Sequence, residues 1–280
     1  MTPRSWLYVP GHRVDRIGRA LESSADAVVI DLEDAVPVGA KELALTNALA
    51  ALDLASEDRA IWLRLNAIGS PWLDEELGEL ASAVRKPSGV RLPKAESPRS
   101  VSASVDRIDC PVHVMVESAT ALLDAREIVR CHPRVTGIAL GEADLAADLR
   151  TESDGLEWAR GWIVAVARAE GLASPVQSVW TDVEDIAGLA HSSRAARARG
   201  FFGRSVIHPK QIEIVNEAYT PSPSELRTAQ RVVERAAAAA AAGESAVLDE
   251  DGRFIDPAVV ANARIVLERS SVTAEPGVQA

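Results

Sequence analysis

Acidic residues follow two apolar segments in the middle of the chain. Residues 112–116 (VHVMV) end at Glu117, and residues 135–140 (VTGIAL) are followed by Glu142 and Asp144. Apolar runs of this length between polar loops are typical of buried parallel strands. Because α/β folds place their chemistry just past the carboxyl ends of such strands, Glu117 and Asp144 form the candidate carboxylate pair. Glu142 is a further acid at the same place.

These acids suit a hard cation. Mg²⁺ prefers oxygen ligands, keeps several waters and often takes only one or two protein carboxylates. The two cysteines, Cys110 and Cys131, are far apart and form no CxxC pair, so neither a structural disulfide nor zinc is expected. Any single acid could instead be a solvated loop residue. That alternative weakens when several acids and an arginine follow successive strands.

Arg64 lies within the apolar segment 61–66 (IWLRLN). Since a charged residue in a strand is rarely buried without a partner, two interpretations stay open. Its guanidinium could bind a substrate carboxylate as a fork, or it could pair with a strand-end acid such as Glu33. His208 follows the last apolar run, and a structural role for it is at least as plausible as a catalytic one.

The elements that must position these residues alternate between strand and helix. Eight such units over about 220 residues with parallel strands could form an open doubly wound sheet or a closed barrel. The count favours a (β/α)₈ TIM barrel over residues 1–220, and no GxGxxG follows the first strand. The predicted strands are residues 6–10, 27–33, 61–66, 90–94, 112–117, 137–144, 174–182 and 201–209.

Pro221 and Pro223 interrupt this pattern. Residues 221–270 are predicted to form a helix with Ser224 as N-cap and Gly243 past its end, a hairpin around Asp251-Gly252, and a last helix. This helix–hairpin–helix extension is too small for its own core, so it should pack on the barrel or on a neighbouring subunit. Residues 271–280 are predicted to be a disordered tail.

The composition restricts the class of protein. The chain has 280 residues, 47% of them hydrophobic, and a formal net charge of −11. A charge of this sign argues against nucleic-acid binding, and no apolar run is long enough to span a membrane. The apolar stretch at the N-terminus is too short for a signal peptide, so a cytoplasmic protein is expected.

The sequence resembles the citrate lyase β-subunit (CitE-like) family, within the HpcH/HpaI aldolase superfamily. The resemblance runs from Arg4 to Glu268 with its motifs in the same order, and several motifs together are far more specific than one. The matching stretches are residues 4–17, 26–44, 62–70, 90–97, 116–128, 138–150, 203–223 and 252–268.

The resemblance implies a TIM barrel and Mg²⁺-dependent cleavage or formation of a carbon–carbon bond. Substrates would be 3-hydroxy-acyl-CoA thioesters such as citryl-, malyl-, methylmalyl- or citramalyl-CoA, and products a 2-oxo acid and an acyl-CoA. It further implies a homo-oligomer, as trimers or dimers of trimers. Alternatives are an aldolase acting on free 2-oxo acids, a citrate lyase β subunit in a larger complex, and a catalytically silent binding module.

The resemblance also implies roles for individual residues. Glu117 and Asp144 match the metal ligands, with Glu117 also at the substrate. Arg64 matches the arginine that holds the oxo acid, and Asp256 matches the acid/base, which in this group acts from a neighbouring subunit. Beyond the matched residues, Glu33 and Asp34 are expected to hold metal-bound waters. The CoA phosphates need positive charge, for which Arg4, Arg13, Arg16 and Lys94 are weaker candidates.

Two departures from the family pattern border the substrate. The family usually reads GAED where this chain has Gly141-Glu142-Ala143-Asp144, and often Thr-Pro or Thr-Ala where it has Ser118-Ala119. The aspartate keeps its place, so the register favours Asp144 as the metal ligand and leaves Glu142 unexplained. Substrate identity is affected more than the metal site.

Overall fold

The computed structural model describes residues 2–243, 247–248 and 252–271. By its internal contacts the chain forms two compact units, residues 2–217 and the segment from residue 218 onward. The division falls three residues before the predicted boundary at 220. None of the described helices is both long and apolar enough to cross a membrane.

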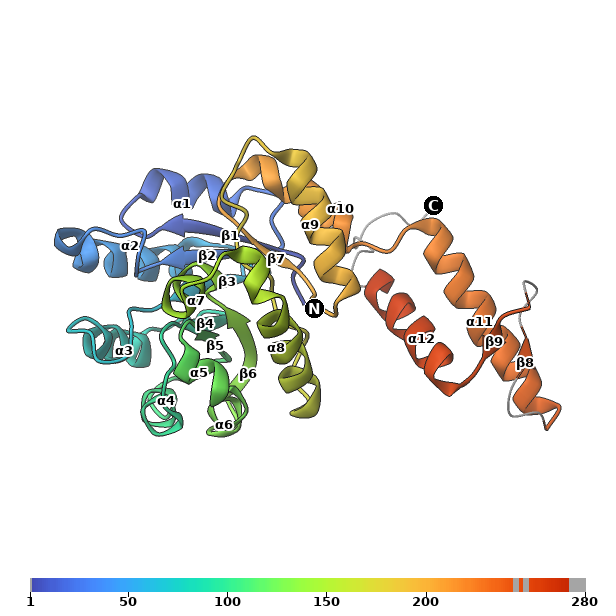
Figure 1. Ribbon diagram of the computed structural model, residues 1–280. Coiled ribbons are helices and arrows are strands. Elements are labelled where there is room, and N and C mark those ends of the chain that lie inside the picture. The colour runs from blue at the N-terminus through green and yellow to red at the C-terminus, as the bar shows by residue number, and fades with distance from the viewer. Residues whose placement is uncertain (1, 244–246, 249–251, 272–280) are drawn as a thin grey trace. The chain divides into compact units, whose positions relative to one another are not determined.

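The first unit is built on a curled parallel sheet of seven strands, with helices along its outer side (Figure 1). The strand order is β6-β5-β4-β3-β2-β1-β7, so strands adjacent in sequence are adjacent in the sheet and the last strand pairs with the first. A doubly wound sheet would instead reverse its order at a switch point. The strands are β1 (Ser5–Pro10), β2 (Ala27–Asp31), β3 (Ile61–Arg64), β4 (Gly89–Leu92), β5 (Val112–Val116), β6 (Val135–Leu140) and β7 (Arg204–Val206).

The predicted strand at residues 174–182 is not a regular strand. It is reduced to two isolated parallel bridges, one from Val176 to Ala139 of β6 and one from Gln177 to Arg204 of β7. The segment contains Pro175, which has no N–H to donate to a ladder, and this accounts for part of its irregularity. The prediction of a parallel α/β fold is confirmed, and that of eight regular strands is wrong.

Helices follow the strands as the alternating pattern predicts. Short 3-10 helices come directly before three of the α-helices: η1 (Val38–Ala40), η2 (Ser153–Leu156) and η3 (Pro209–Gln211). The α-helices are α1 (Val14–Leu21), α2 (Lys41–Leu54), α3 (Leu73–Ser82), α4 (Pro98–Val105), α5 (Ala119–Leu123), α6 (Ala125–Arg130), α7 (Glu142–Leu149), α8 (Glu157–Ala169), α9 (Ile186–Ala198) and α10 (Ile212–Tyr219).

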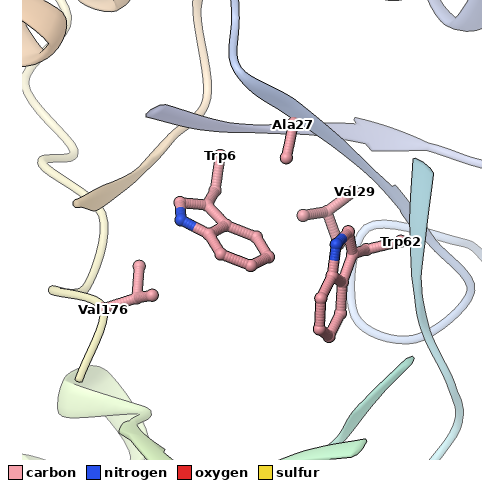
Figure 2. Packing of buried hydrophobic residues seen from close by; sticks show 5 residues of the cluster. All are labelled: Trp6, Ala27, Val29, Trp62 and Val176. Atoms are coloured by element: carbon pink, nitrogen blue, oxygen red, sulfur yellow. The ribbon is translucent and has the colours of Figure 1, made fainter. Parts of the chain in front are cut away.

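The interior of the curled sheet is closed near the strand N-termini by large side chains. Figure 2 shows Trp6 and Trp62 pointing toward each other from β1 and β3, beside smaller residues such as Val29. The two indole centroids are 5.0 Å apart in an edge-on arrangement. A Cβ at Gly89 would collide with the Trp62 ring, and one at Gly137 with the ring of His113 on β5, so glycines make room for this plug.

The second unit contains α11 (Pro223–Ala241), the antiparallel pair β8 (Val247–Leu248) and β9 (Phe254–Ile255), and α12 (Pro257–Ser271). The predicted helix, hairpin strands and last helix are therefore all present; Asp251 of the hairpin turn lies outside the described residues. The N-cap of α11 is Ser222, which forms a capping box with Glu225, and not Ser224. Pro223 at the first helical position favours this earlier start. The predicted tail lies outside the described residues, except for Ser271, which ends α12.

Candidate active site

A cavity of about 320 Å³ opens among the carboxyl ends of the strands in the first unit. Parallel strands bring all these ends to one edge, which is why residues far apart in the sequence meet here. The lining combines apolar side chains with acids and two arginines. Its polar members include Tyr8, Asp31, Asp34, Arg64, Arg91, Glu117, Glu142, Asp144, Gln177, Ser178 and Ser205.

Glu117 is held at the end of β5 by its neighbours. It is 6% exposed, and its Oε2 accepts a hydrogen bond of 3.0 Å from the backbone N–H of Lys94. A Cβ at Gly141 would lie 2.5 Å from Glu117 Oε1 and 2.6 Å from its Cγ. The glycine therefore supplies the space that the carboxylate occupies.

Asp144 lies in the first turn of α7, exposed, and lines the same cavity as Glu117. Burial, followed by the nearby charges of Glu33 and Asp144, raises the pKa of Glu117 to about 7. A carboxylate whose pKa is raised in this way lacks sufficient positive charge around it, and a cation would supply that charge. Among the described residues no group of three or more His, Cys, Asp or Glu side chains is placed to hold a metal ion. The pair alone still suits a cation that keeps waters or substrate as its other ligands.

Glu142, the departure from the family pattern, binds an arginine of the neighbouring helix. Its Oε2 lies 2.5 Å from Arg160 Nη2, and its Oε1 accepts from Arg160 Nε at 3.2 Å. Arg160 also bonds Glu157 and Ser153, so it ties α7 to the start of α8. Glu142 therefore lines the cavity while its carboxylate is engaged by an ion pair with α8.

Arg64 is surrounded by acids. Its Nε and Nη2 form a fork on Asp31 at 2.7 and 2.6 Å, and its Nη1 reaches Glu33 at 3.0 Å and Asp34 at 3.1 Å. Burial alone would lower the pKa of Arg64, but the hydrogen bond and charge of Asp31 outweigh it and raise the pKa. The ion-pair interpretation is thus the arrangement observed, and a substrate carboxylate would have to displace Glu33 or Asp34 to bind.

Lys94 connects two acids, Glu33, which follows β2, and Glu117, which follows β5. Its Nζ lies 2.9 Å from Glu33 Oε1, while its backbone N–H binds Glu117. Lys94 has φ of 50°, a left-handed conformation that few non-glycine residues adopt and that recurs at functional sites. Burial raises the pKa of Glu33, an effect that the charges of Arg64 and Lys94 only partly offset.

A buried network that sequence reasoning missed supports these loops. Lys41 Nζ donates at 2.7 Å to each of three oxygens, the backbone carbonyls of Leu32 and Glu33 and Oδ1 of Asn66. The backbone N–H of Asn66 donates in turn to Glu76. Burial raises the pKa of Glu76 to about 7. Lys41 and Glu76 read as ordinary polar residues of amphipathic helices, so no local signal marks them.

Arg91 on β4 was also missed, although its signal was present. Like Arg64, it is a charged residue within an apolar strand, and it is 1% exposed. Its Nη1 donates to the hydroxyls of Tyr8 at 2.8 Å and Ser205 at 3.0 Å, and its guanidinium lies 4.4 Å from the centroid of the Trp6 ring. The structure therefore brings a second arginine to the cavity.

Several candidates are not among the residues that line the cavity. Arg4 precedes β1 and pairs with Asp26, which precedes β2, so it lies at the amino edge of the sheet, opposite the cavity. Arg13 pairs with Asp15, and Arg16 is exposed on α1. His208 accepts a hydrogen bond from the N–H of Lys210 and begins η3, a structural role.

Asp256 belongs to the second unit and begins α12. Its Oδ1 accepts a hydrogen bond of 2.8 Å from the backbone N–H of Val259. This is the geometry of a helix N-cap, with Pro257 in the first helical position. The side chain is therefore fixed at the start of a helix, whatever further role it has.

Comparison with known proteins agrees with this arrangement. The family model described as HpcH/HpaI aldolase/citrate lyase matches residues 4–209. The chain belongs to the HpcH/HpaI aldolase/citrate lyase family. The resemblance inferred from the motifs is thereby confirmed. The match over residues 4–209 includes the acids and arginines that line the cavity.

Similar proteins in this family cover nearly the whole chain. A (3S)-malyl-CoA thioesterase of Cereibacter sphaeroides is 33% identical, over 98% of this chain and 96% of the relative. The citrate lyase subunit beta of Escherichia coli K12 is 32% identical, over 97% and 94%. The crystal structure of CitE from Mycobacterium tuberculosis, in complex with magnesium, acetoacetate and coenzyme A, is 31% identical with a TM-score of 0.82, covering 96% of this chain and 98% of that one.

Proposed function

We propose that this protein is a Mg²⁺-dependent carbon–carbon lyase. It would cleave, or form, a 3-hydroxy-acyl-CoA thioester such as citryl-, malyl-, methylmalyl- or citramalyl-CoA, with a 2-oxo acid and an acyl-CoA as the other side of the reaction. The observation that carries the proposal is the pair Glu117 and Asp144 in one cavity, with Glu117 seated against Gly141. The solved M. tuberculosis relative, which binds magnesium and coenzyme A, supports it.

The residues present fit Mg²⁺. Glu117 and Asp144 offer carboxylate oxygens, and the pKa of Glu117 is raised by burial and then by the charges of Glu33 and Asp144, effects that a bound cation would offset. Glu33 and Asp34, which pair with Arg64, would hold waters around the ion. When bound, Mg²⁺ supplies Lewis-acid stabilisation of charge on the substrate oxygen that becomes the carbonyl of the 2-oxo acid.

Two side chains of the protein, Arg64 and Asp256, would then have separate roles in cleavage. Arg64 holds the carboxylate of the oxo-acid half, in exchange for Glu33 or Asp34. As the bond between C2 and C3 breaks, the C3 hydroxyl releases its proton to water and becomes a carbonyl, and the thioester half leaves as an enolate. The proton released there balances the one that the enolate carbon takes up, so the reaction has no net proton change. Asp256 delivers a proton to the enolate carbon, and in condensation it removes that proton.

The proposal also includes the binding of coenzyme A and the assembly of subunits into an oligomer. Arg16 on α1 and Lys94 after β4 provide positive charge for the phosphates. Residues 1–220 would act as a TIM barrel closed by the bridges at Val176 and Gln177. The extension from 221 to 270 would pack on a neighbouring subunit of a trimer and bring Asp256 to that subunit's cavity, as the family pattern implies.

A second candidate function is hydrolysis of the thioester. Similarity to the (3S)-malyl-CoA thioesterase of C. sphaeroides favours it. In that reaction the carbon–carbon bond stays intact, and free coenzyme A leaves with the hydroxy acid. The products therefore separate the two candidates.

Replacement of Asp144 tests the metal assignment. Asp144→Asn should weaken Mg²⁺ binding, measured by calorimetry, and abolish Mg²⁺-dependent release of 2-oxo acid. Asp53→Asn, a change at an exposed acid of α2 outside the cavity, is the matched control and should alter neither. Unchanged Mg²⁺ affinity in Asp144→Asn would refute the assignment.

Two substitutions at Asp256 separate catalysis from capping. Asn is as good an N-cap as Asp, whereas Ala costs about 1 kcal/mol at such a position. Asp256→Asn should therefore lose turnover with unchanged stability and Mg²⁺ binding, while Asp256→Ala should lose turnover and also unfold at lower urea. Full activity of Asp256→Asn would leave Asp256 with its capping role alone.

A further inference from the structure

Arg91 is a buried cation without a counter-ion. Its side chain is 1% exposed, and no carboxylate forms an ion pair with it in the part of the chain that the structure describes. Only its Nη1 is hydrogen-bonded, to the hydroxyls of Tyr8 and Ser205. Its Nε and Nη2 are buried with no hydrogen-bond partner among the described residues.

Such a group is costly to bury. A desolvated charge is normally paired, and an unsatisfied buried donor loses its hydration without return. Stacking on Trp6, at 4.4 Å, offsets part of this cost but provides no acceptor for the N–H groups of Nε and Nη2. The residues in register with Arg91 on the neighbouring strands are Arg64 and His113, and neither can carry the negative charge that a counter-ion needs.

Arg64 shows what a satisfied arginine looks like in the same cavity. Three carboxylates occupy its Nε, Nη1 and Nη2. Both arginines line the cavity, yet only Arg91 has donors left over. A ligand carboxylate would find on Arg91 two unoccupied N–H groups of one guanidinium, the arrangement that binds carboxylates as a fork.

Arg91 also lies deeper in the barrel interior than the carboxylate pair. It pairs in register with His113, which precedes Glu117 by four residues on the next strand. The backbone of Arg91 is also in register with that of Arg64 on the adjacent strand β3, and both side chains line the cavity. Since the proposed function assigns the carboxylate of the oxo-acid half to Arg64, a second carboxylate on the same short substrate would lie next to Arg91.

We propose that Arg91, oriented by Tyr8 and Ser205, forms a second anion subsite that binds a distal carboxylate on the 2-oxo-acid half of the substrate. The subsite rests on the proposed lyase function and narrows it. Among the possible oxo acids it selects those that carry a second carboxylate, as oxaloacetate does, over those that end in hydrogen or a methyl group. Arg91 is then a specificity-determining residue and not a catalytic one.

The test compares two ligands that differ only at the distal end. Oxaloacetate and 2-oxobutyrate have the same number of carbons, and a methyl group replaces the distal carboxylate in the second. Calorimetric titration with Mg²⁺ present should show that the wild-type protein binds oxaloacetate more tightly. Arg91→Met should weaken oxaloacetate binding about 10- to 100-fold, the range for a lost charged hydrogen bond, and leave 2-oxobutyrate unchanged.

Two further variants control for packing. Arg91→Lys keeps the charge without the fork and should retain part of the preference; a preference no greater than that of Arg91→Met would point to packing and overturn the proposal. Arg59→Met removes a half-buried arginine that bonds the carbonyls of Ala20 and Ala25, outside the cavity, and should not change the preference.

The outcomes separate the subsite from the lyase proposal. If Arg91→Met weakens both ligands equally, or neither, the subsite is wrong while the lyase function stands. If the wild-type protein binds neither 2-oxo acid with Mg²⁺, both fall. Since an unpaired buried charge with unsatisfied donors is costly, Arg91→Met should not lower the unfolding temperature in the absence of ligand.

Discussion

Substituting Gly141 by alanine adds one methyl group and tests whether the space beside Gly141 fixes the position of the Glu117 side chain. The new Cβ would lie 2.5 Å from Glu117 Oε1, 2.6 Å from its Cγ and 2.9 Å from its Cδ. Since carbon atoms in contact prefer about 3.5–4.0 Å, the side chain must move by about 1 Å. That movement would also break the 3.0 Å hydrogen bond from the N–H of Lys94.

The displacement should affect metal binding more than folding. Overpacking of this kind costs about 1–3 kcal/mol of stability, which a folded domain of this size tolerates. Mg²⁺, however, requires oxygen ligands at about 2.0–2.1 Å in near-octahedral geometry. We therefore expect Gly141→Ala to weaken Mg²⁺ binding by about 10- to 100-fold, the effect typical of a disturbed ligand orientation.

Calorimetry with Mg²⁺, and electron paramagnetic resonance with Mn²⁺ as a substitute, would measure the effect. Gly161→Ala is the matched control, because Gly161 lies within α8 and a Cβ there meets nothing within 4 Å. It should bind the metal as the wild type does and be more stable by about 0.5–1 kcal/mol. Wild-type Mg²⁺ affinity in Gly141→Ala would show that the Glu117 carboxylate is not at the metal site.

Three further predictions concern charge at the cavity. Because the pKa of Glu117 is raised to about 7, the carboxylate is ionised above that pH and Mg²⁺ affinity should fall about tenfold from pH 8 to pH 6 in titrations; a flat profile would contradict the role of Glu117. Lys41→Met leaves Asn66 Oδ1 without its donor and removes one donor each from the carbonyls of Leu32 and Glu33, which keep those of Asn66 Nδ2 and the Val36 N–H. Urea unfolding should therefore show a loss of about 1–2 kcal/mol, and wild-type stability would refute the network. Arg160→Met leaves Glu142 unpaired and should cost about 2 kcal/mol by the same measurement, whereas no loss would show that the ion pair is not stabilising.

Hydrophobic periodicity was sufficient to predict the order of strands and helices, because each buried strand is an apolar run between polar loops. It failed at residues 174–182, where Pro175 and the polar Gln177 and Ser178 give only isolated bridges instead of a ladder. Strand-end placement also predicted the cavity acids correctly: Glu117 and Asp144 line one pocket, as two carboxyl ends of adjacent parallel strands must.

The residues that were missed are those whose meaning depends on tertiary contacts. Lys41 and Glu76 lie on helices and look solvent-exposed in sequence, yet both are buried against the β2 and β3 loops. Arg91 met the same criterion as Arg64, but only the structure shows that one arginine is surrounded by acids while the other is not. Glu142 departs from the family motif, and its partner Arg160 lies 18 residues further on, beyond any local pattern.

Product analysis with acyl-CoA thioesters tests the central claim most directly. A panel of citryl-, malyl-, methylmalyl- and citramalyl-CoA would be incubated with the protein and Mg²⁺, and the products identified by mass spectrometry. The lyase proposal predicts a 2-oxo acid and a shortened acyl-CoA in equal amounts from at least one thioester, with no release after Asp144→Asn. Free coenzyme A with an intact hydroxy acid, and no 2-oxo acid, would contradict it and establish thioester hydrolysis instead.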